Sequence, residues 1–183
     1  KVAVPTSELS NITDINGKSL DSLVTNDGSL IAEGGYIQLS AKIAENLMLR
    51  SVNVGSSGIV SAASINQQTG NVVIGGEDNN IVEIKGNINV SGKNPTTPSG
   101  RLTITGTNVY YGGSTNASGS KGGKILAKAK ELMVLDSSIV AKGLKESGGD
   151  LMVVSEDVLL STARTSVDMS GSINGGSIKL HGE

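Results

Sequence analysis

Short apolar runs alternate with turn-forming residues along the chain, and one phrase recurs: a glycine, a variable residue, and then aliphatic residues at alternate positions. Alternation with a period of two is typical of a strand that buries one face. Self-similarity at a spacing of about 20–50 residues indicates a stacked repeat rather than a globular domain. The copies begin at Gly35, Gly70, Gly100, Gly123, Gly149 and Gly176, which lie 35, 30, 23, 26 and 27 residues apart.

Two further strand-like segments lie between successive copies of the phrase. They are short, rich in Val, Ile and Leu, and bounded by Gly, Ser, Asn and Asp, which favour turns. Segment 41–49 is the best helical candidate, but no capped helical stripe supports it, and we favour strand–turn–strand there. The segments are expected at 47–49 and 58–62, at 81–84 and 87–90, at 132–135 and 138–141, and at 158–160 and 166–170.

Three short strands in a repeat of about 27 residues describe one coil of a parallel β-helix. One coil cannot bury its own inner face, so coils must stack about 4.8 Å apart and share continuous inner columns of aliphatic side chains. The sequence therefore predicts an all-β, right-handed parallel β-helix of roughly six coils over residues 30–183. Ile37, Ile104 and Ile178 are expected to line one internal column.

The two ends and one loop are expected to depart from this regularity. Residues 1–29 are predicted to be an irregular stretch or a poorly formed coil. The Pro-rich segment 94–98 is unsuited to a coil wall and is predicted to loop outward. A solenoid needs a polar cap, and none follows the last phrase, so we expect the protein to continue beyond residue 183.

Composition fits thin, repeated layers. The chain has 25 Gly and 3 Tyr but no Phe, Trp or Cys, so its core must consist of small aliphatic side chains. A net charge of −2 gives no electrostatic footprint for nucleic acid, and no apolar run approaches the roughly 20 residues that would span a bilayer. The one basic stretch precedes acidic residues and is expected to be a solvated face: Lys121, Lys124, Lys128 and Lys130, followed by Glu131 and Asp136.

A search for reactive groups predicts no catalytic, cofactor or metal site. His181 is the only histidine, and the absence of Cys excludes thiolate chemistry and disulfides. The acidic pairs 77–78 and 156–157 are expected in turns, because neighbours in a strand point to opposite faces. The glycine pairs at 122–123 and 148–149 lack the remaining residues of a phosphate loop or a calcium-binding roll, and they are expected at coil corners.

Two surface features leave alternatives open. Asn11, Asn89 and Asn116 each begin an Asn-x-Ser/Thr sequon, which is expected by chance in a chain this rich in Asn, Ser and Thr. Whether any of them is glycosylated stays open. The pair Tyr110 and Tyr111 could form an exposed binding patch, although a packed pair at the coil wall is favoured.

The repeated phrases resemble those of filamentous-haemagglutinin-like exoproteins of Gram-negative bacteria. The resemblance spans roughly residues 28–183 and is carried by 34–41, 58–62, 70–74, 88–92, 99–106 and 115–125. It implies export by two-partner secretion through a dedicated outer-membrane β-barrel transporter. The secretion domain of that family carries an Asn-Pro-Asn motif, from which Asn94-Pro95-Thr96 departs, so this chain is placed beyond that domain or at its edge.

The expected function is therefore a non-enzymatic one. The chain would be a secreted, cell-surface adhesin or its β-helical stalk, and its partners would be the export transporter and a receptor or glycan on a host or neighbouring cell. One alternative is a carbohydrate-active β-helix, lyase-like or tailspike-like, which requires carboxylates and basic groups that converge on one outer face. Another is the stalk of a toxin or haem-acquisition exoprotein of the same secretion class.

Overall fold

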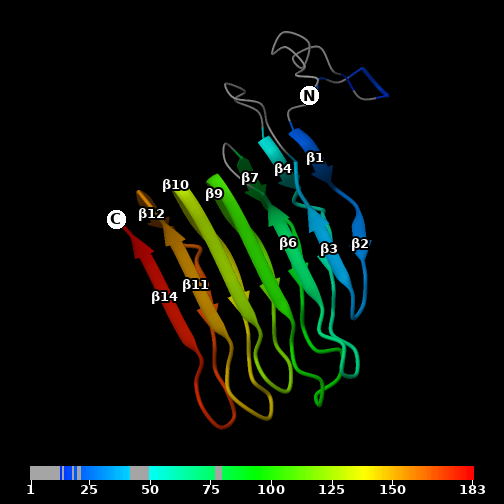
Figure 1. Cartoon of the computed structure of the whole chain (residues 1–183), viewed down its shortest axis with the longest axis vertical. Helices are drawn as coiled ribbons and strands as arrows, with labels where there is room; N and C mark the ends of the chain where they lie inside the picture. Colours follow the sequence, from blue (N-terminus) through cyan, green and yellow to red (C-terminus); the bar gives the residue numbers. More distant parts are fainter. Residues whose placement is uncertain (1–12, 14, 18, 20–21, 42–49, 77–79) are drawn as a thin grey trace.

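The computed structural model describes residues 13, 15–17, 19, 22–41, 50–76 and 80–183. These residues form a parallel β-solenoid of about six turns (Figure 1), as the glycine-led repeat predicted. Every pairing between named strands is parallel, because each coil lies on the equivalent part of the next. No helix occurs in the described part, and thus none that could cross a membrane. The right-handed sense, which general rules for parallel crossovers favour, stays a prediction.

The strands form three walls, which we number in the order in which they follow the repeated glycine. Wall 1 contains β3 (Tyr36–Leu39), β6 (Asn71–Gly75), the start of β9 (Arg101–Asn116), the start of β10 (Lys124–Val140), β11 (Asp150–Ser155) and β14 (Ser177–Gly182). Wall 2 contains β1 (Ser22–Asn26), β4 (Arg50–Val54), β7 (Ile81–Ile84), the middle of β9 and of β10, and β12 (Val158–Ser161). Wall 3 contains β2 (Ser29–Ile31), β5 (Ile59–Ser61), β8 (Asn87–Asn89), the ends of β9 and β10, and β13 (Ser166–Asp168).

In the middle of the solenoid the walls are joined without a break. The segments 132–135 and 138–141, predicted as separate strands, belong to β10, which runs through all three walls to Val140 beside an equally continuous β9. A register shift between Ala129 and Leu132 marks the corner between walls 1 and 2. The chain therefore bends at the corners with its pairing interrupted only by this register shift.

Two inward columns run along wall 1, because positions two and four after the repeated glycine both point inside. The first column contains Ile37, Val72, Leu102, Ile125, Leu151 and Ile178. The second contains Leu39, Ile74, Ile104, Ala127, Val153 and Leu180. Ile37 and Ile178 thus share a column as predicted, but placing Ile104 with them was wrong. Ile104 is the other inward residue of its phrase.

The interior is almost entirely aliphatic. Val52, Val82 and Met133 fill it from wall 2 and are fully buried. Tyr111 is the one aromatic residue in this core; its hydroxyl is hydrogen-bonded to Thr115 Oγ1 at 2.7 Å, and burial raises its pKa. Tyr110 points to the outside, so the predicted packed pair is divided between the two faces of the wall.

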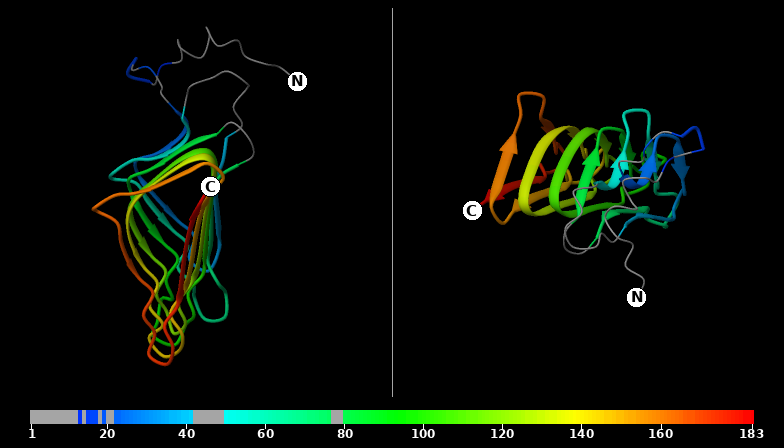
Figure 2. Two further views of the ribbon diagram at one scale, coloured as in Figure 1. Left: turned by 90° about the vertical axis from the view of Figure 1, so that its left-hand side faces the viewer. Right: turned by 90° about the horizontal axis from the view of Figure 1, so that it is seen from above.

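The repeated glycines close the narrow corner between walls 3 and 1, seen at the lower end of the cross-section in Figure 2. Gly149 N–H donates to the carbonyl oxygen of Ala141 at 2.8 Å, across the thin interior of one coil. A Cβ on Gly149 would lie 2.4 Å from Gly123 O, which belongs to the adjacent coil. Equivalent bonds join Gly100 to Val90, Gly123 to Ala117, and Gly176 to Met169. Glycine begins each phrase because only a residue without Cβ fits here.

Other predictions concern the ends and loops. Residues Lys93 to Thr96 are exposed at the narrow corner, and the chain returns inward at buried Thr97. The segment 1–29 contributes β1 and the first residue of β2, and β1 pairs with β4 of the next coil. Its residues 1–12, 14, 18, 20 and 21 lie outside the described part. The candidate helix at 41–49 and the strand expected at 47–49 also fall largely outside it, and the strand observed in that coil is β4.

Candidate functional site

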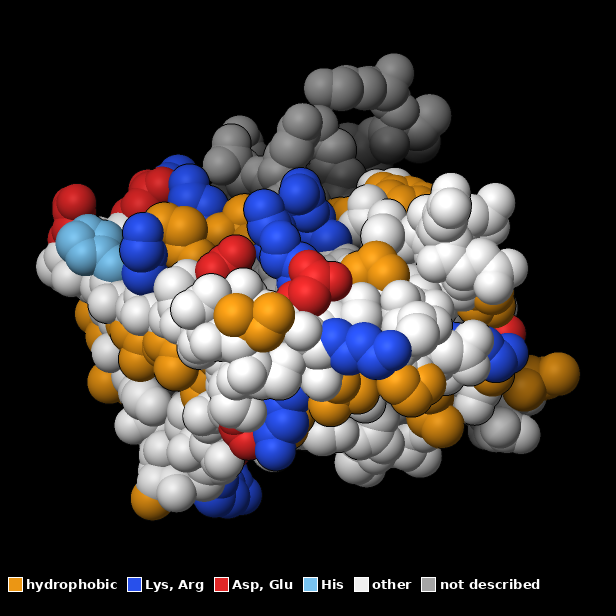
Figure 3. Space-filling view, turned by 90° about the horizontal axis from the view of Figure 1, so that it is seen from below, with side chains coloured by type: hydrophobic (Ala, Val, Ile, Leu, Met, Phe, Trp, Pro, Cys, Tyr) orange, Lys and Arg blue, Asp and Glu red, His pale blue; other side chains and the backbone are white. Residues whose placement is uncertain are grey.

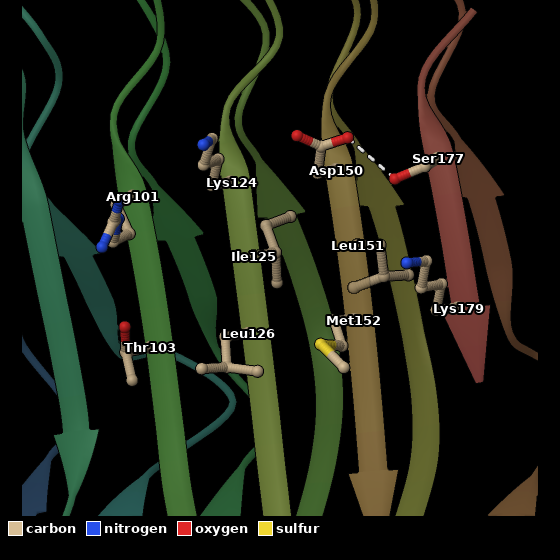
Figure 4. A pocket seen from close by; sticks show the side chains of 10 residues that line it. All are labelled: Arg101, Thr103, Lys124, Ile125, Leu126, Asp150, Leu151, Met152, Ser177 and Lys179. Carbon is tan, nitrogen blue, oxygen red and sulfur yellow. Dashed lines mark hydrogen bonds between the residues drawn. The ribbon is translucent and has the colours of Figure 1, made fainter. Parts of the chain in front are cut away.

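A shallow groove of about 470 Å³ lies on the outer side of wall 1 (Figure 4), and the sequence analysis named no site there. We call it the wall-1 groove. Its lining side chains come from four successive coils, on β9, β10, β11 and β14. The outward-facing ones are Arg101, Thr103, Lys124, Leu126, Asp150, Met152, Ser177 and Lys179.

Stacking brings these residues together in two outward columns. The residue that follows the repeated glycine forms one column, which consists of Arg101, Lys124, Asp150 and Ser177. The residue two positions later forms the other, which consists of Thr103, Leu126, Met152 and Lys179. Aligning the repeats on their glycines would have revealed both columns in advance, because each column lies at a constant offset from that glycine.

The first column places like charges side by side. Arg101 and Lys124 are direct ladder partners on adjacent coils, and the next position is Asp150. The Asp150 carboxylate accepts a hydrogen bond from Ser177 Oγ at 2.7 Å, and no ion pair joins it to Lys124. Like charges on directly opposed positions of neighbouring strands destabilise a sheet.

The second column supplies a partly apolar floor. Leu126 is half-buried, and Met152 is 45% exposed between Leu126 on one side and Lys179 on the other. The wall-1 groove therefore offers cationic and hydroxyl donors above an apolar strip. Such a surface can hold a ligand by charge, hydrogen bonding and nonpolar contact together.

A second polar cluster lies at the corner between walls 2 and 3 and centres on Asp136. Its carboxylate accepts hydrogen bonds from the Tyr110 hydroxyl, the Thr162 hydroxyl and the Arg164 guanidinium, whose Nε lies 3.0 Å from Oδ1. These residues come from three successive coils. Hydrogen bonds from Thr162, Tyr110 and Arg164, with the charge of Arg164, lower the pKa of Asp136 to about 2.

The same bonds determine what this cluster can do. Donating to Asp136 raises the pKa of the Tyr110 hydroxyl, so Tyr110 stays protonated at neutral pH. An ionised carboxylate with all these donors is neither a general acid nor a free base at that pH. The arrangement fits a clamp that holds three coils in register.

Acid is expected to weaken the solenoid through this clamp. An unfolded Asp has a pKa of about 3.9, whereas the pKa of Asp136 in the folded chain is about 2. The pKa of folded Asp168 is also about 2, because Lys142 and Ser170 donate hydrogen bonds to its carboxylate. Because the pKa is lower in the folded state, the ionised carboxylate stabilises the fold above about pH 4. This stabilisation is lost as the pH falls through about 2. We expect Asp136→Asn to lower the midpoint of urea unfolding at pH 7. The difference between the midpoints of the variant and the parent chain should become smaller towards pH 2.

Glu156→Gln provides the control, because Glu156 is exposed in a turn and the charge change is the same. Its midpoint should follow that of the parent chain at every pH. A gap between Asp136→Asn and the parent chain that is equally wide at pH 7 and pH 2 would contradict the clamp.

Three residues singled out from the sequence are exposed, as expected. His181 is exposed on β14, with Nε2 3.9 Å from Glu183 Oε1. Glu156 and Asp157 are exposed in the turn between β11 and β12. The other acidic pair, 77–78, lies outside the described residues.

The described carboxylates are distributed over different walls, and Figure 3 shows acidic side chains scattered on the face that it presents. Glu83 on wall 2 pairs with Arg50 and Lys85, and Asp168 on wall 3 pairs with Lys142. Within residues 22–41, 50–76 and 80–183, no three His, Asp or Glu side chains gather as metal ligands would.

The sequons differ in accessibility. Asn89 is partly buried, and its side chain accepts from Ser91 N–H at 3.1 Å and donates to Ser61 Oγ at 3.2 Å. Asn116 is exposed at the end of β9 and accepts from Ser118 N–H at 3.0 Å. Asn11 lies outside the described residues. Glycosylation stays a prediction, for which Asn116 is the more accessible position.

Comparisons with family models, with curated proteins and with solved structures found no match to this chain. The resemblance to filamentous-haemagglutinin-like exoproteins therefore stays an expectation from the repeated phrases. A function has to be argued from the solenoid and from the surfaces that it presents.

Proposed function

We propose that the chain is the β-helical stalk, or part of the adhesive surface, of a secreted bacterial adhesin. The observation that supports this most is the unbroken parallel stacking of coils, each of which has a thin aliphatic interior. A solenoid lengthens by adding coils without any change to its cross-section, so it can project a binding surface far from a membrane. The outer walls are then free to vary and to bind a receptor or a glycan.

Export by two-partner secretion is part of the proposal. The chain contains no Cys, so no disulfide has to form before or after passage through an outer-membrane transporter. Each coil pairs only with its neighbours, and folding of such a chain can propagate coil by coil. These features support the proposed route, in which the transporter is the partner during export.

Adhesion can be tested with the 183-residue chain itself. Beads coated with the purified chain are expected to attach to host epithelial cells or to neighbouring bacteria in a dose-dependent manner, and soluble chain should compete. Attachment equal to that of albumin-coated beads would remove the adhesive function. Antibodies against the chain should label intact producing cells and detect protein in the culture medium; signal confined to broken cells would contradict secretion.

The alternative of a carbohydrate-active β-helix has one favourable observation, the basic wall-1 groove. It predicts that the chain shortens a polysaccharide, which an assay for new reducing ends or for unsaturated products would detect. Binding of a polysaccharide without any shortening would support the adhesin proposal. Release of shortened products would favour the carbohydrate-active β-helix instead.

A further inference from the structure

Of the twelve basic residues in the described part, five form ion pairs and seven do not. On wall 2, on wall 3 and at the corners, five of them pair with carboxylates: Arg50, Lys85, Lys93, Lys142 and Arg164. On wall 1, four outward-facing basic residues form no ion pair in the described part: Arg101, Lys124, Lys128 and Lys179. The other three basic residues without an ion pair lie at corners: Lys121, Lys130 and Lys145. Wall 1 is therefore the only one of the three walls that presents unpaired cations among the described residues, in a chain whose net charge is −2.

The stacking of Arg101 on Lys124 makes this arrangement costly for the folded chain. Two cations at adjacent ladder positions repel each other, and the carboxylate at the next ladder position, on Asp150, accepts a hydrogen bond from Ser177. A destabilising arrangement of this kind is typical of sites that are built to bind something. An anionic group placed between Arg101 and Lys124 would remove the repulsion.

We propose that the wall-1 groove binds a linear acidic glycan, whose carboxylates lie against Arg101, Lys124 and Lys179. This inference rests on the proposed adhesive function and names its ligand class. Arg101 and Lys124 project from adjacent coils, which are about 4.8 Å apart, close to the length of one sugar residue in an extended glycan. Lys179 lies two coils beyond Lys124. The groove extends over four successive coils, so a glycan chain can lie across several of them.

Asp150, whose carboxylate is hydrogen-bonded to Ser177, is the one acidic side chain in the wall-1 groove, and other lining side chains suit an acidic glycan. The planar Arg101 guanidinium can bind a carboxylate through two parallel hydrogen bonds. Leu126 and Met152 offer an apolar strip for the nonpolar faces of sugar rings, and Thr103 adds a hydroxyl. The groove contains no aromatic side chain on which a nucleic-acid base could stack, so a glycan is favoured over a single-stranded nucleic acid.

The test is binding of the purified chain to polygalacturonate, with neutral dextran and oligo-dT as comparison ligands. We expect binding to polygalacturonate that weakens as NaCl rises from 0.05 to 0.5 M, because added salt shortens the range of charge interactions. In Arg101→Gln/Lys124→Gln, affinity should fall about tenfold or more, since two charged contacts are lost. The urea midpoint of this variant should equal or exceed that of the parent chain, because the repulsion is also lost.

Lys93→Gln/Lys142→Gln is the matched control, because it removes the same charge from cations that already have carboxylate partners. It should keep its affinity for polygalacturonate within about twofold. The proposal would be overturned by no binding, by an equal loss in both variants, or by equal or tighter binding of dextran or oligo-dT.

The bead assay separates this inference from the proposed function. If beads coated with Arg101→Gln/Lys124→Gln adhere to cells as well as the parent chain does, the ligand class is wrong and adhesion stands. If the parent chain binds polygalacturonate but its beads do not adhere, the groove stands and the adhesive function fails.

Discussion

Gly149→Val is expected to prevent cooperative folding of the coils around the narrow corner. A Cβ at this position would lie 2.4 Å from Gly123 O and 2.7 Å from Ala141 Cβ, and both neighbours are held by the ladder. Relief would require breaking the bond from Gly149 N–H to Ala141 O. We expect a loss of about 3 kcal/mol or more in the free energy of unfolding, measured by urea denaturation followed by far-ultraviolet circular dichroism.

Gly175→Ala is the matched control, because a Cβ at Gly175 has nothing within 4 Å. It should change the free energy of unfolding by no more than about 0.5 kcal/mol. If Gly149→Val unfolds at the same urea concentration as Gly175→Ala, the close approach of backbone at this corner is not what requires glycine.

Leu102→Ala should be the second large effect. Leu102 is fully buried in the first column of wall 1, with Val72 and Ile125 as its ladder partners on the adjacent coils. Truncation leaves a cavity in an interior only one side chain deep, and we expect a loss of about 2–5 kcal/mol in the free energy of unfolding. Urea denaturation at pH 7 measures it.

Leu144→Ala removes the same atoms from a residue that is 53% exposed at the narrow corner. A change of no more than about 0.5 kcal/mol is expected there. A loss at Leu102 as small as at Leu144 would mean that the aliphatic columns contribute little to stability.

The regular part of this fold is predictable because every coil obeys the same local rules. Glycine is needed where backbone approaches backbone, and the second and fourth residues after it face inward, so the phrase fixes both the corner and the column. Segment 81–84 coincides with β7, and 158–160 with most of β12. The error over Ile104 arose because an alternating strand has two inward positions per phrase, and only a register shows which residues stack.

The coil corners and the surface sites are less predictable, because they depend on contacts between coils. Nothing local in the sequence shows that β9 and β10 keep their pairing through two corners. Lys124 was expected on a solvated face, and it does lie on an outer face, but its neighbour Arg101 is 23 residues away in the sequence. The partnership of Asp136 with Arg164 likewise appears only when two coils are placed in register.

The direction of the backbone hydrogen bonds determines how this molecule would respond to tension. The bonds between coils point along the stacking direction. A force applied in that direction at the two ends therefore acts first on the hydrogen bonds of the terminal coil. These bonds break one after another before the next coil is strained. Extension would proceed in steps, each of which adds the length of one unfolded coil, so the proposed stalk would lengthen gradually under flow and could refold when the force falls.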